Sequence, residues 1–254
     1  MSRSMITFAI ILVLIYLGLC AVLFMFQRSL IYFPQPRSLG KAAPTMTLPV
    51  DGADLVITVR PHAGPHALIY FGGNAEDVSY SLPSFSAAFP DYALYLAHYR
   101  GYGGSSGKPS EASLVADALA LYDSVQTDHK QIVVVGRSLG SGVAVQLASL
   151  RAVERLVLVT PYDSIQKLAG RQFPYFPVRW LLRDKFESWK YAPQITAPTL
   201  LIAAEEDEVI PLASTESLFK SFRAGVAKLK IIAGAGHNSV SESLEYLPQL
   251  KGLP

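Results

Sequence analysis

Residues 132–150 restrict the fold more than any other part of the chain. They begin with the β-branched run IVVV, continue through Gly136-Arg137-Ser138-Leu139-Gly140, and end in small and apolar residues over the length of a helix. This succession predicts a buried strand, a sharp turn and a helix. The turn matches the pattern G-x-S-x-G. Gly136 and Gly140 have no Cβ that would crowd a serine held on a strained turn.

Short apolar runs of the same kind recur along the chain and alternate with helical patterns. The predicted strands are 54–60, 67–71, 93–97, 132–135, 156–159, 200–203 and 230–233, and the predicted helices cover about 20 residues after Ser110, 140–150 and 239–250. Fully apolar strands that alternate with helices predict a mostly parallel sheet covered on both faces, an α/β fold. With 254 residues, half of them hydrophobic, the chain can build one large core.

The chain also begins with a long apolar run, residues 6–26, that carries no charge. As a helix these residues extend about 30 Å, the thickness of a bilayer core. The run has no A-x-A-like cleavage site, Leu19 rather than a small residue precedes Cys20, and a core helix is seldom apolar on all sides. We predict an uncleaved single-pass anchor. Arg3 and Arg28 flank it almost evenly, so the side of the membrane stays open.

The sequence therefore predicts three parts. They are an anchor over 1–27, a proline-rich connector over 28–53, and an α/β domain over 54–254. Residues 161–198 contain five prolines and both tryptophans and are too long for a simple connection, so we expect a small cap there. A net charge of +2 without a Lys/Arg block does not favour nucleic-acid binding, and one cysteine allows no disulfide within the chain.

A serine hydroxyl is a weak nucleophile until a base takes its proton. His237 lies in GAGHNS, directly after the last predicted strand, where an α/β sheet presents its carboxyl edge. His98 also ends a strand and competes with it. We predict Ser138 as the nucleophile and His237 as the base.

The base needs a carboxylate that fixes its tautomer. Four acids follow the strand 200–203 in the run EEDEVIP, and Asp207 is favoured because the residues after it, ending in Pro211, turn the chain into the next helix. We interpret the other three as a solvated acidic loop: Glu205, Glu206 and Glu208. The order Ser138, Asp207, His237 is the order of serine, acid and histidine that accompanies G-x-S-x-G.

An oxyanion hole needs two backbone N–H donors. We predict Leu139, the residue after the nucleophile, and Asn74, in the loop that follows the strand 67–71 and begins Gly72-Gly73-Asn74. A serine at a helix N-terminus is also favourably placed for developing negative charge.

These motifs resemble the α/β-hydrolase superfamily, in its serine aminopeptidase-like and prolyl-oligopeptidase-like branch. More narrowly, the chain is similar to single-pass, N-terminally anchored α/β-hydrolase domain proteins. The segments that carry the resemblance are FQRSLIYFPQPR, HYRGYGGSSGKPSE, GRSLGSGVA, TPYDSI, DEVIP and GAGHNS. The resemblance implies an α/β-hydrolase fold, the same triad and oxyanion donors, and hydrolysis of carboxylic esters, lipids or thioesters of protein-bound acyl chains. One position departs, because the group usually has His-Gly-Asn where this chain has Gly72-Gly73-Asn74.

We therefore expect two-step acyl transfer through an acyl-enzyme, with no need for a metal ion or an organic cofactor. The expected partners are an acylated small molecule, lipid or protein substrate, and membrane lipid around the N-terminal helix. Two other readings stay open, a serine peptidase that acts on short peptides and a catalytically silent, membrane-tethered scaffold.

The cap is rich in aromatic side chains, which would line an acyl pocket, rest on the lipid surface, or bury the cap against the sheet. They are Phe173, Tyr175, Phe176, Trp180, Phe186 and Trp189. Outside the cap's aromatic set, Asp163 is expected to cap a short helix, and Arg100 and Arg137 are expected to be structural ion-pair partners.

Overall fold

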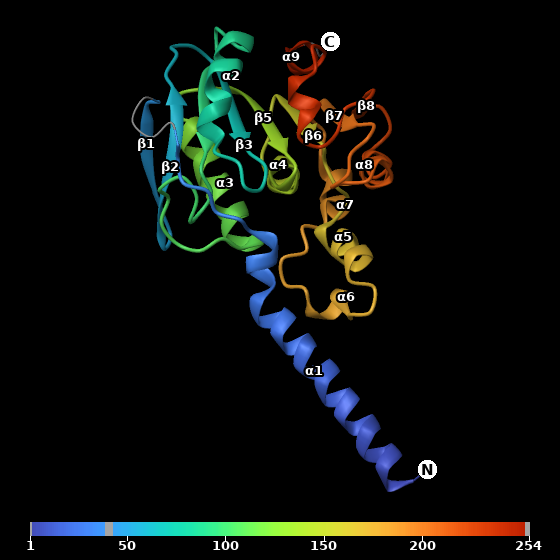
Figure 1. Ribbon diagram of the computed structural model, residues 1–254. Helices are drawn as coiled ribbons and strands as arrows, with labels where there is room; N and C mark the ends of the chain where they lie inside the picture. Colours follow the sequence, from blue (N-terminus) through green and yellow to red (C-terminus); the bar gives the residue numbers. More distant parts are fainter. Residues whose placement is uncertain (1, 39–42, 252–254) are drawn as a thin grey trace.

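The computed structural model describes residues 2–38 and 43–251, and within them eight strands form one sheet (Figure 1). The strands are β1 (Thr45–Val50), β2 (Ala53–Arg60), β3 (His66–Phe71), β4 (Ala93–Ala97), β5 (Gln131–Arg137), β6 (Arg155–Val159), β7 (Thr199–Ala204) and β8 (Ala227–Ile232). Their order is β1-β2-β4-β3-β5-β6-β7-β8. β2 pairs antiparallel with β1 and β4, and the other pairs are parallel. The predicted mostly parallel α/β fold is confirmed.

Helices connect the strands and cover both faces of the sheet. They are α1 (Arg3–Ile31), η1 (Val78–Ser81), α2 (Leu82–Ala88), α3 (Glu111–Val125), α4 (Leu139–Leu150), α5 (Ile165–Gln172), α6 (Val178–Leu181), α7 (Ser188–Tyr191), η2 (Ala192–Gln194), α8 (Leu212–Phe219), η3 (Ser239–Glu242) and α9 (Tyr246–Lys251). Side chains of β3 alternate between two cores: Ile69 packs in the core that holds α3, α4 and α8, and Tyr70 in the core that holds α2 and α9. Such alternation follows from the two-residue period of a strand.

Several elements differ from the sequence prediction, among them α2, which was not predicted, and β8, which begins at Ala227 rather than at residue 230. β1 lies in the segment expected to be a connector; it is a half-exposed edge strand that contains Pro49, and edge strands tolerate proline. α3 has 15 residues rather than about 20: Ser110 caps its start as expected, but the helix ends at Val125. The predicted helix over 239–250 is divided into η3 and α9, and Pro248 lies in the first turn of α9, where a missing N–H is tolerated.

α1 projects away from the sheet, and the two termini lie at opposite ends of the molecule (Figure 1). Cys20 and Gln27 are its buried residues. Among the helices within 2–38 and 43–251, α1 is the one that is long and apolar enough to cross a membrane.

The carboxyl-terminal part of α1 is attached to the cap by polar contacts. The Gln27 amide donates to the carbonyl oxygen of Leu181 (3.1 Å) and accepts from the N–H of Arg183 (2.7 Å). The buried carboxylate of Asp184 accepts from Arg28 Nε (3.0 Å) and from the hydroxyl of Tyr32 (3.2 Å). These contacts fix the position of α1 against the cap.

The cap contains α5, α6, α7 and η2, and its aromatic side chains have different surroundings. Phe186 is fully buried, whereas Phe173 and Phe176 line a cavity. Tyr175 and Trp180 are 86% and 81% exposed. The cap aromatics therefore do not share one role. Burial of the cap describes Phe186, a pocket lining describes Phe173 and Phe176, and Tyr175 and Trp180 are free to contact solvent or lipid.

A matched pair of substitutions tests what holds the sheet's first half to α3. Arg100 forms two hydrogen bonds to Asp117 (2.8 and 2.7 Å), and the two side chains are only 12% and 8% exposed. Arg100→Met leaves the buried carboxylate of Asp117 unpaired, so we expect the free energy of unfolding to fall by about 3 kcal/mol. The pair of Arg151 and Asp123 has the same geometry but is 35% and 49% exposed. Arg151→Met should cost less than about 1 kcal/mol.

Urea unfolding of the two variants in the same detergent measures the difference. Equal losses would contradict the assignment of Arg100 as a buried structural partner, since burial is the main feature in which the pairs differ.

Candidate active site

Ser138 lies on the predicted sharp turn between β5 and α4. Its backbone has φ 48° and ψ −115°, a conformation that a residue with a Cβ seldom adopts. The two glycines explain how the turn closes. A Cβ at Gly136 would lie 2.5 Å from the carbonyl oxygen of Gly140, and a Cβ at Gly140 would lie 2.1 Å from the carbonyl oxygen of Phe71. The turn therefore brings α4 directly against the end of β3.

The structure brings the three predicted side chains together in one hydrogen-bonded row. Nε2 of His237 lies 3.0 Å from Oγ of Ser138, and Nδ1 of His237 lies 2.8 Å from Oδ2 of Asp207. Ser138 follows β5, Asp207 follows β7 and His237 follows β8. The carboxyl ends of these strands meet at one edge of the sheet. His237 and the Asp207 carboxylate are buried, so little water competes for these contacts. These distances fit the roles predicted for the three side chains, a nucleophile, a base and an orienting acid.

Asp207 is the acid of the EEDE run that binds the His237 ring. Its Oδ1 also accepts the N–H groups of Val209 (2.9 Å) and Ile210 (2.6 Å), which fix the carboxylate. Glu205 instead accepts the N–H of Gly234, away from the histidine ring. The competing His98 is buried elsewhere, 2.9 Å from the Thr58 hydroxyl, and burial lowers its pKa to about 4.

Glu208 has a role that the sequence analysis missed. Its carboxylate accepts the backbone N–H of His237 (3.1 Å), which holds the histidine loop beside the acid loop. The N–H groups of Glu208 itself and of His237 lower the pKa of this carboxyl. The one signal for this contact in the sequence is that an acid directly follows Asp207.

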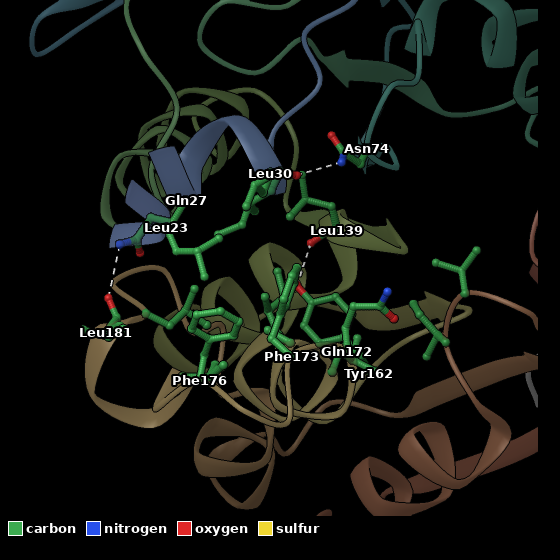
Figure 2. Close-up of a pocket in the computed structure, with 18 of the residues that line it drawn as sticks. Leu23, Gln27, Leu30, Asn74, Leu139, Tyr162, Gln172, Phe173, Phe176 and Leu181 are labelled. Atoms are coloured by element: carbon green, nitrogen blue, oxygen red, sulfur yellow. Dashed lines mark hydrogen bonds between the residues drawn. The ribbon is translucent and has the colours of Figure 1, made fainter. Parts of the chain in front are cut away.

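Asn74 and Leu139 line one cavity with Ser138, as expected of residues near a reacting group. The Asn74 side chain does something else as well. It donates to the carbonyl oxygen of Ile31 (2.7 Å) and accepts from the N–H of Phe33 (2.9 Å) and the Tyr102 hydroxyl (2.8 Å). Figure 2 shows this bond to the end of α1. Asn74 thus connects the predicted oxyanion loop to the N-terminal helix.

Glu76 holds the loop in which the usual histidine is replaced by Gly72. Its carboxylate accepts the N–H of Gly73 (2.6 Å) and the hydroxyl of Tyr70 (2.8 Å), and it pairs with Arg137 (3.3 Å). A Cβ at Gly72 would lie 2.4 Å from Val78, so this packing needs glycine there. In this protein the carboxylate of Glu76 therefore supports the loop.

Two buried tyrosines donate hydrogen bonds to backbone carbonyls of the same region. The Tyr99 hydroxyl donates to the carbonyl oxygen of Gly72 (2.7 Å), and the Tyr162 hydroxyl donates to that of Leu139 (3.1 Å). Burial raises the pKa of both phenols well above the ordinary value, so they keep their protons.

A cavity of about 420 Å³, whose lining includes Ser138, lies between α1 and the cap. Figure 2 shows residues of this lining. One wall comes from α1 through Leu23, Phe24, Gln27, Leu30 and Ile31, and the opposite wall from cap residues that include Phe173 and Phe176. Within the described chain its lining contains no acidic or basic side chain. Its size and apolar lining are those of a site for a small apolar ligand.

The remaining polar candidates are structural. Arg137 pairs with Glu76, as expected. The prediction for Asp163 is wrong, because Ser164 caps α5 and Asp163 is buried, with its carboxylate bound by the hydroxyls of Ser214 (2.9 Å) and Ser217 (3.0 Å) and by Lys167. In the described part of the chain, no three His, Cys, Asp or Glu side chains are placed to hold a metal ion.

Comparisons with known proteins agree with this fold. An uncharacterized protein of Mycobacterium tuberculosis is 33% identical, over 90% of this chain and 86% of that protein. Alpha/beta hydrolase domain-containing protein 17B of Homo sapiens is 31% identical, over 78% of this chain and 69% of that protein.

Solved esterases share the architecture at low identity. The Pyrococcus furiosus esterase Pf2001 superimposes with a TM-score of 0.69 at 18% identity, over 86% of this chain and 97% of that one. Est1E from Butyrivibrio proteoclasticus, solved with ferulic acid, superimposes with a TM-score of 0.65 at 17% identity, over 81% of this chain and 94% of that one. Residues 62–194 match the model of the alpha/beta hydrolase family, and the chain belongs to that family.

Proposed function

We propose that the protein is a serine hydrolase that cleaves ester or thioester bonds of substrates with an acyl chain, beside a membrane. The observation that carries this proposal is the row of Ser138, His237 and Asp207, with contacts of 3.0 and 2.8 Å, at one end of an apolar cavity. Esters and thioesters offer the carbonyl that such a row attacks.

The proposed reaction has two steps. His237 takes the proton of the Ser138 hydroxyl as Oγ attacks the carbonyl carbon, and the N–H groups of Leu139 and Asn74 stabilise the oxyanion. The alcohol or thiol leaves with the proton from His237. Water, activated by the same histidine, then hydrolyses the acyl-enzyme. Asp207 keeps the histidine in the tautomer that this sequence of proton transfers needs.

The cavity lining favours an acyl chain over a peptide. Recognition of a free peptide terminus needs a charged partner, and the cavity lining in the described chain has none. An acyl chain needs apolar walls, which α1 and the cap supply.

We also infer membrane anchoring by α1, with the parts 1–27, 28–53 and 54–254 as anchor, connector and hydrolase domain. The motifs and the exposed apolar helix support a place among the single-pass, N-terminally anchored members of the serine aminopeptidase-like or prolyl-oligopeptidase-like branch. Extraction of membranes with alkaline carbonate tests the anchoring. Release of the protein into the soluble fraction would refute it.

A fluorophosphonate probe tests the hydrolase proposal. We expect labelling of the full-length protein, none of Ser138→Ala, and normal labelling of the control Ser149→Ala, which changes another serine of α4. Absence of labelling in folded wild type would favour the scaffold alternative. A series of p-nitrophenyl esters and acyl thioesters of increasing chain length, beside free-amine peptides, then separates acyl hydrolysis from peptidase activity.

A further inference from the structure

We propose that the tip of the cap, residues 173–182, enters the near leaflet of the bilayer beside α1, so that the cavity of Ser138 receives acyl chains directly from the lipid. This inference rests on the proposed anchoring and acyl hydrolysis, and it names where the substrate enters. The partner that it assigns to the cap tip is the hydrocarbon of a phospholipid leaflet.

The length of α1 requires this contact. The Tyr16 hydroxyl donates to the carbonyl oxygen of Tyr175 (2.9 Å), and the Tyr16 ring stacks on Phe176 with a centroid distance of 5.9 Å. From Arg3 to Tyr16, α1 rises about 20 Å. The hydrocarbon core of a bilayer is about 30 Å thick. A spanning α1 therefore places about 10 Å of that core around the part of the helix that the cap tip contacts.

The exposed surface of the cap tip combines aromatic side chains with one charge, that of Arg179, and this combination suits the depth at which headgroups meet hydrocarbon. Tyr175 and Trp180 are 86% and 81% exposed, and tyrosine and tryptophan are the side chains that gather at membrane interfaces. The guanidinium of Arg183 lies 4.2 Å from the ring centroid of Phe24, so a charge accompanies the apolar surface where α1 meets the cap. Arginine beside an interface can reach the lipid headgroups along its aliphatic stem.

Much of the backbone of the cap tip is hydrogen-bonded within the protein, which lowers the cost of placing it at the edge of the hydrocarbon, where unpaired polar groups are costly. Pro174 and Pro177 have no N–H, and the N–H groups of Phe176, Trp180 and Leu182 are bonded within the tip. The side chains of α1 satisfy two further carbonyls: Tyr16 binds that of Tyr175, and Gln27 binds that of Leu181.

The same two elements line the cavity. Leu23 of α1 faces Phe173 and Phe176 of the cap (Figure 2), and the same lining also contains Phe24 and Ser138. An acyl chain that enters between α1 and the cap tip would reach the Ser138 hydroxyl through apolar surroundings. The acyl chain would then not be exposed to water on the way, which avoids the free-energy cost of that exposure.

Tryptophan fluorescence in nanodiscs tests the position of the cap tip without any need for activity. In a Trp180→Phe, Trp189→Phe background, Tyr175→Trp introduces one indole at the cap tip. The matched reference is Trp180→Phe alone, which keeps Trp189 on α7. Nanodiscs of dioleoylphosphatidylcholine are compared with nanodiscs of the same lipid brominated on its acyl chains. We expect the bromolipid to quench the indole introduced by Tyr175→Trp and to leave Trp189 bright. Equal quenching of both, or stronger quenching of Trp189, overturns the proposal.

A second variant tests the route of the substrate. Tyr175→Arg puts a charge into the leaflet at a side chain that is exposed, so folding should be preserved. We expect kcat/KM for a long-chain ester embedded in nanodiscs to fall about tenfold, with no change for a soluble butyrate ester. Tyr80→Arg, at an exposed tyrosine of η1, is the control and should leave both values unchanged. An equal fall for the two substrates, or no fall for either, contradicts entry from the leaflet.

The readouts separate this inference from the proposals beneath it. Bromolipid quenching of the cap tip does not depend on hydrolysis, so the hydrolase proposal is tested independently by fluorophosphonate labelling. Carbonate extraction tests α1 alone. A labelled, membrane-bound protein whose cap tip is not quenched would refute the leaflet contact and nothing else.

Discussion

Asp207→Asn is expected to lower kcat for a soluble short-chain ester by about 10⁴-fold, with KM nearly unchanged. Asparagine keeps the shape of the carboxylate, and its Oδ1 can still accept the N–H groups of Val209 and Ile210. It cannot stabilise the imidazolium that forms when His237 takes the serine proton. It also favours the wrong tautomer, because its amide donates to Nδ1 and leaves the proton on Nε2.

The acidic run itself supplies the control for this substitution. Glu206 is exposed and its carboxylate has no hydrogen bond in the structure, so Glu206→Gln should leave kcat unchanged. Steady-state kinetics on the two variants and on wild type, at equal concentrations of folded protein, provide the measurement. A comparable loss in both would mean that the charge of the whole loop matters rather than the contact between Asp207 and His237.

Gly140→Ala is expected to destabilise the protein by about 3 kcal/mol or more, since the added Cβ would lie 2.1 Å from the backbone of Phe71 and 2.6 Å from that of Gly72. Backbone on both sides of the contact cannot rotate away as a side chain does. Either α4 separates from β3 or the turn at Ser138 changes. The melting temperature should fall by about 6–12 °C for a chain of this size.

Gly170→Ala is the matched control for Gly140→Ala. Gly170 also lies within a helix, α5, and a Cβ there would meet nothing within 4 Å. Alanine should stabilise that helix by about 0.5–1 kcal/mol. Thermal unfolding of the two variants in one detergent checks both signs. A Gly140→Ala protein that melts with the wild type and still labels with fluorophosphonate would show that the turn does not need its glycine.

Local sequence signals were enough to predict much of this fold and the residues of its candidate site. The apolar runs predict β3 to β7 because these strands are buried on both faces. β2 and β8 are only partly buried but still contain a recognisable apolar run, whereas β1 was missed because its half-exposed pattern with Pro49 lacks that signature. Ser138, Asp207 and His237 could be identified because each directly follows a strand, and parallel strands bring their carboxyl ends to one edge. Their distances agree with the prediction, while their catalytic roles stay predictions.

Contacts between distant segments could not be predicted in this way. Asn74 binds the end of α1, Glu76 pairs with Arg137, and Asp184 meets Arg28 and Tyr32. Each contact joins residues with no periodic or spacing signal between them. The misassignment of Asp163 has the same origin, since the hydroxyls that bind it come from α8, about 50 residues later in the chain. Propensity describes neighbours in the sequence, whereas these partners are set by the folded chain.

The attachment of α1 to Asn74, the cap and the cavity means that this helix is not an exchangeable module. A version trimmed to residues 45–251 for solubility would lack one side of the cavity and the partners of the Asp184 carboxylate, so substrate preferences measured on it would describe a different site. Grafting an unrelated membrane helix onto the same domain would restore location without restoring that side. The shape of the cavity therefore depends on individual side chains of α1 such as Gln27 and Phe24, and not only on the overall hydrophobicity of the helix.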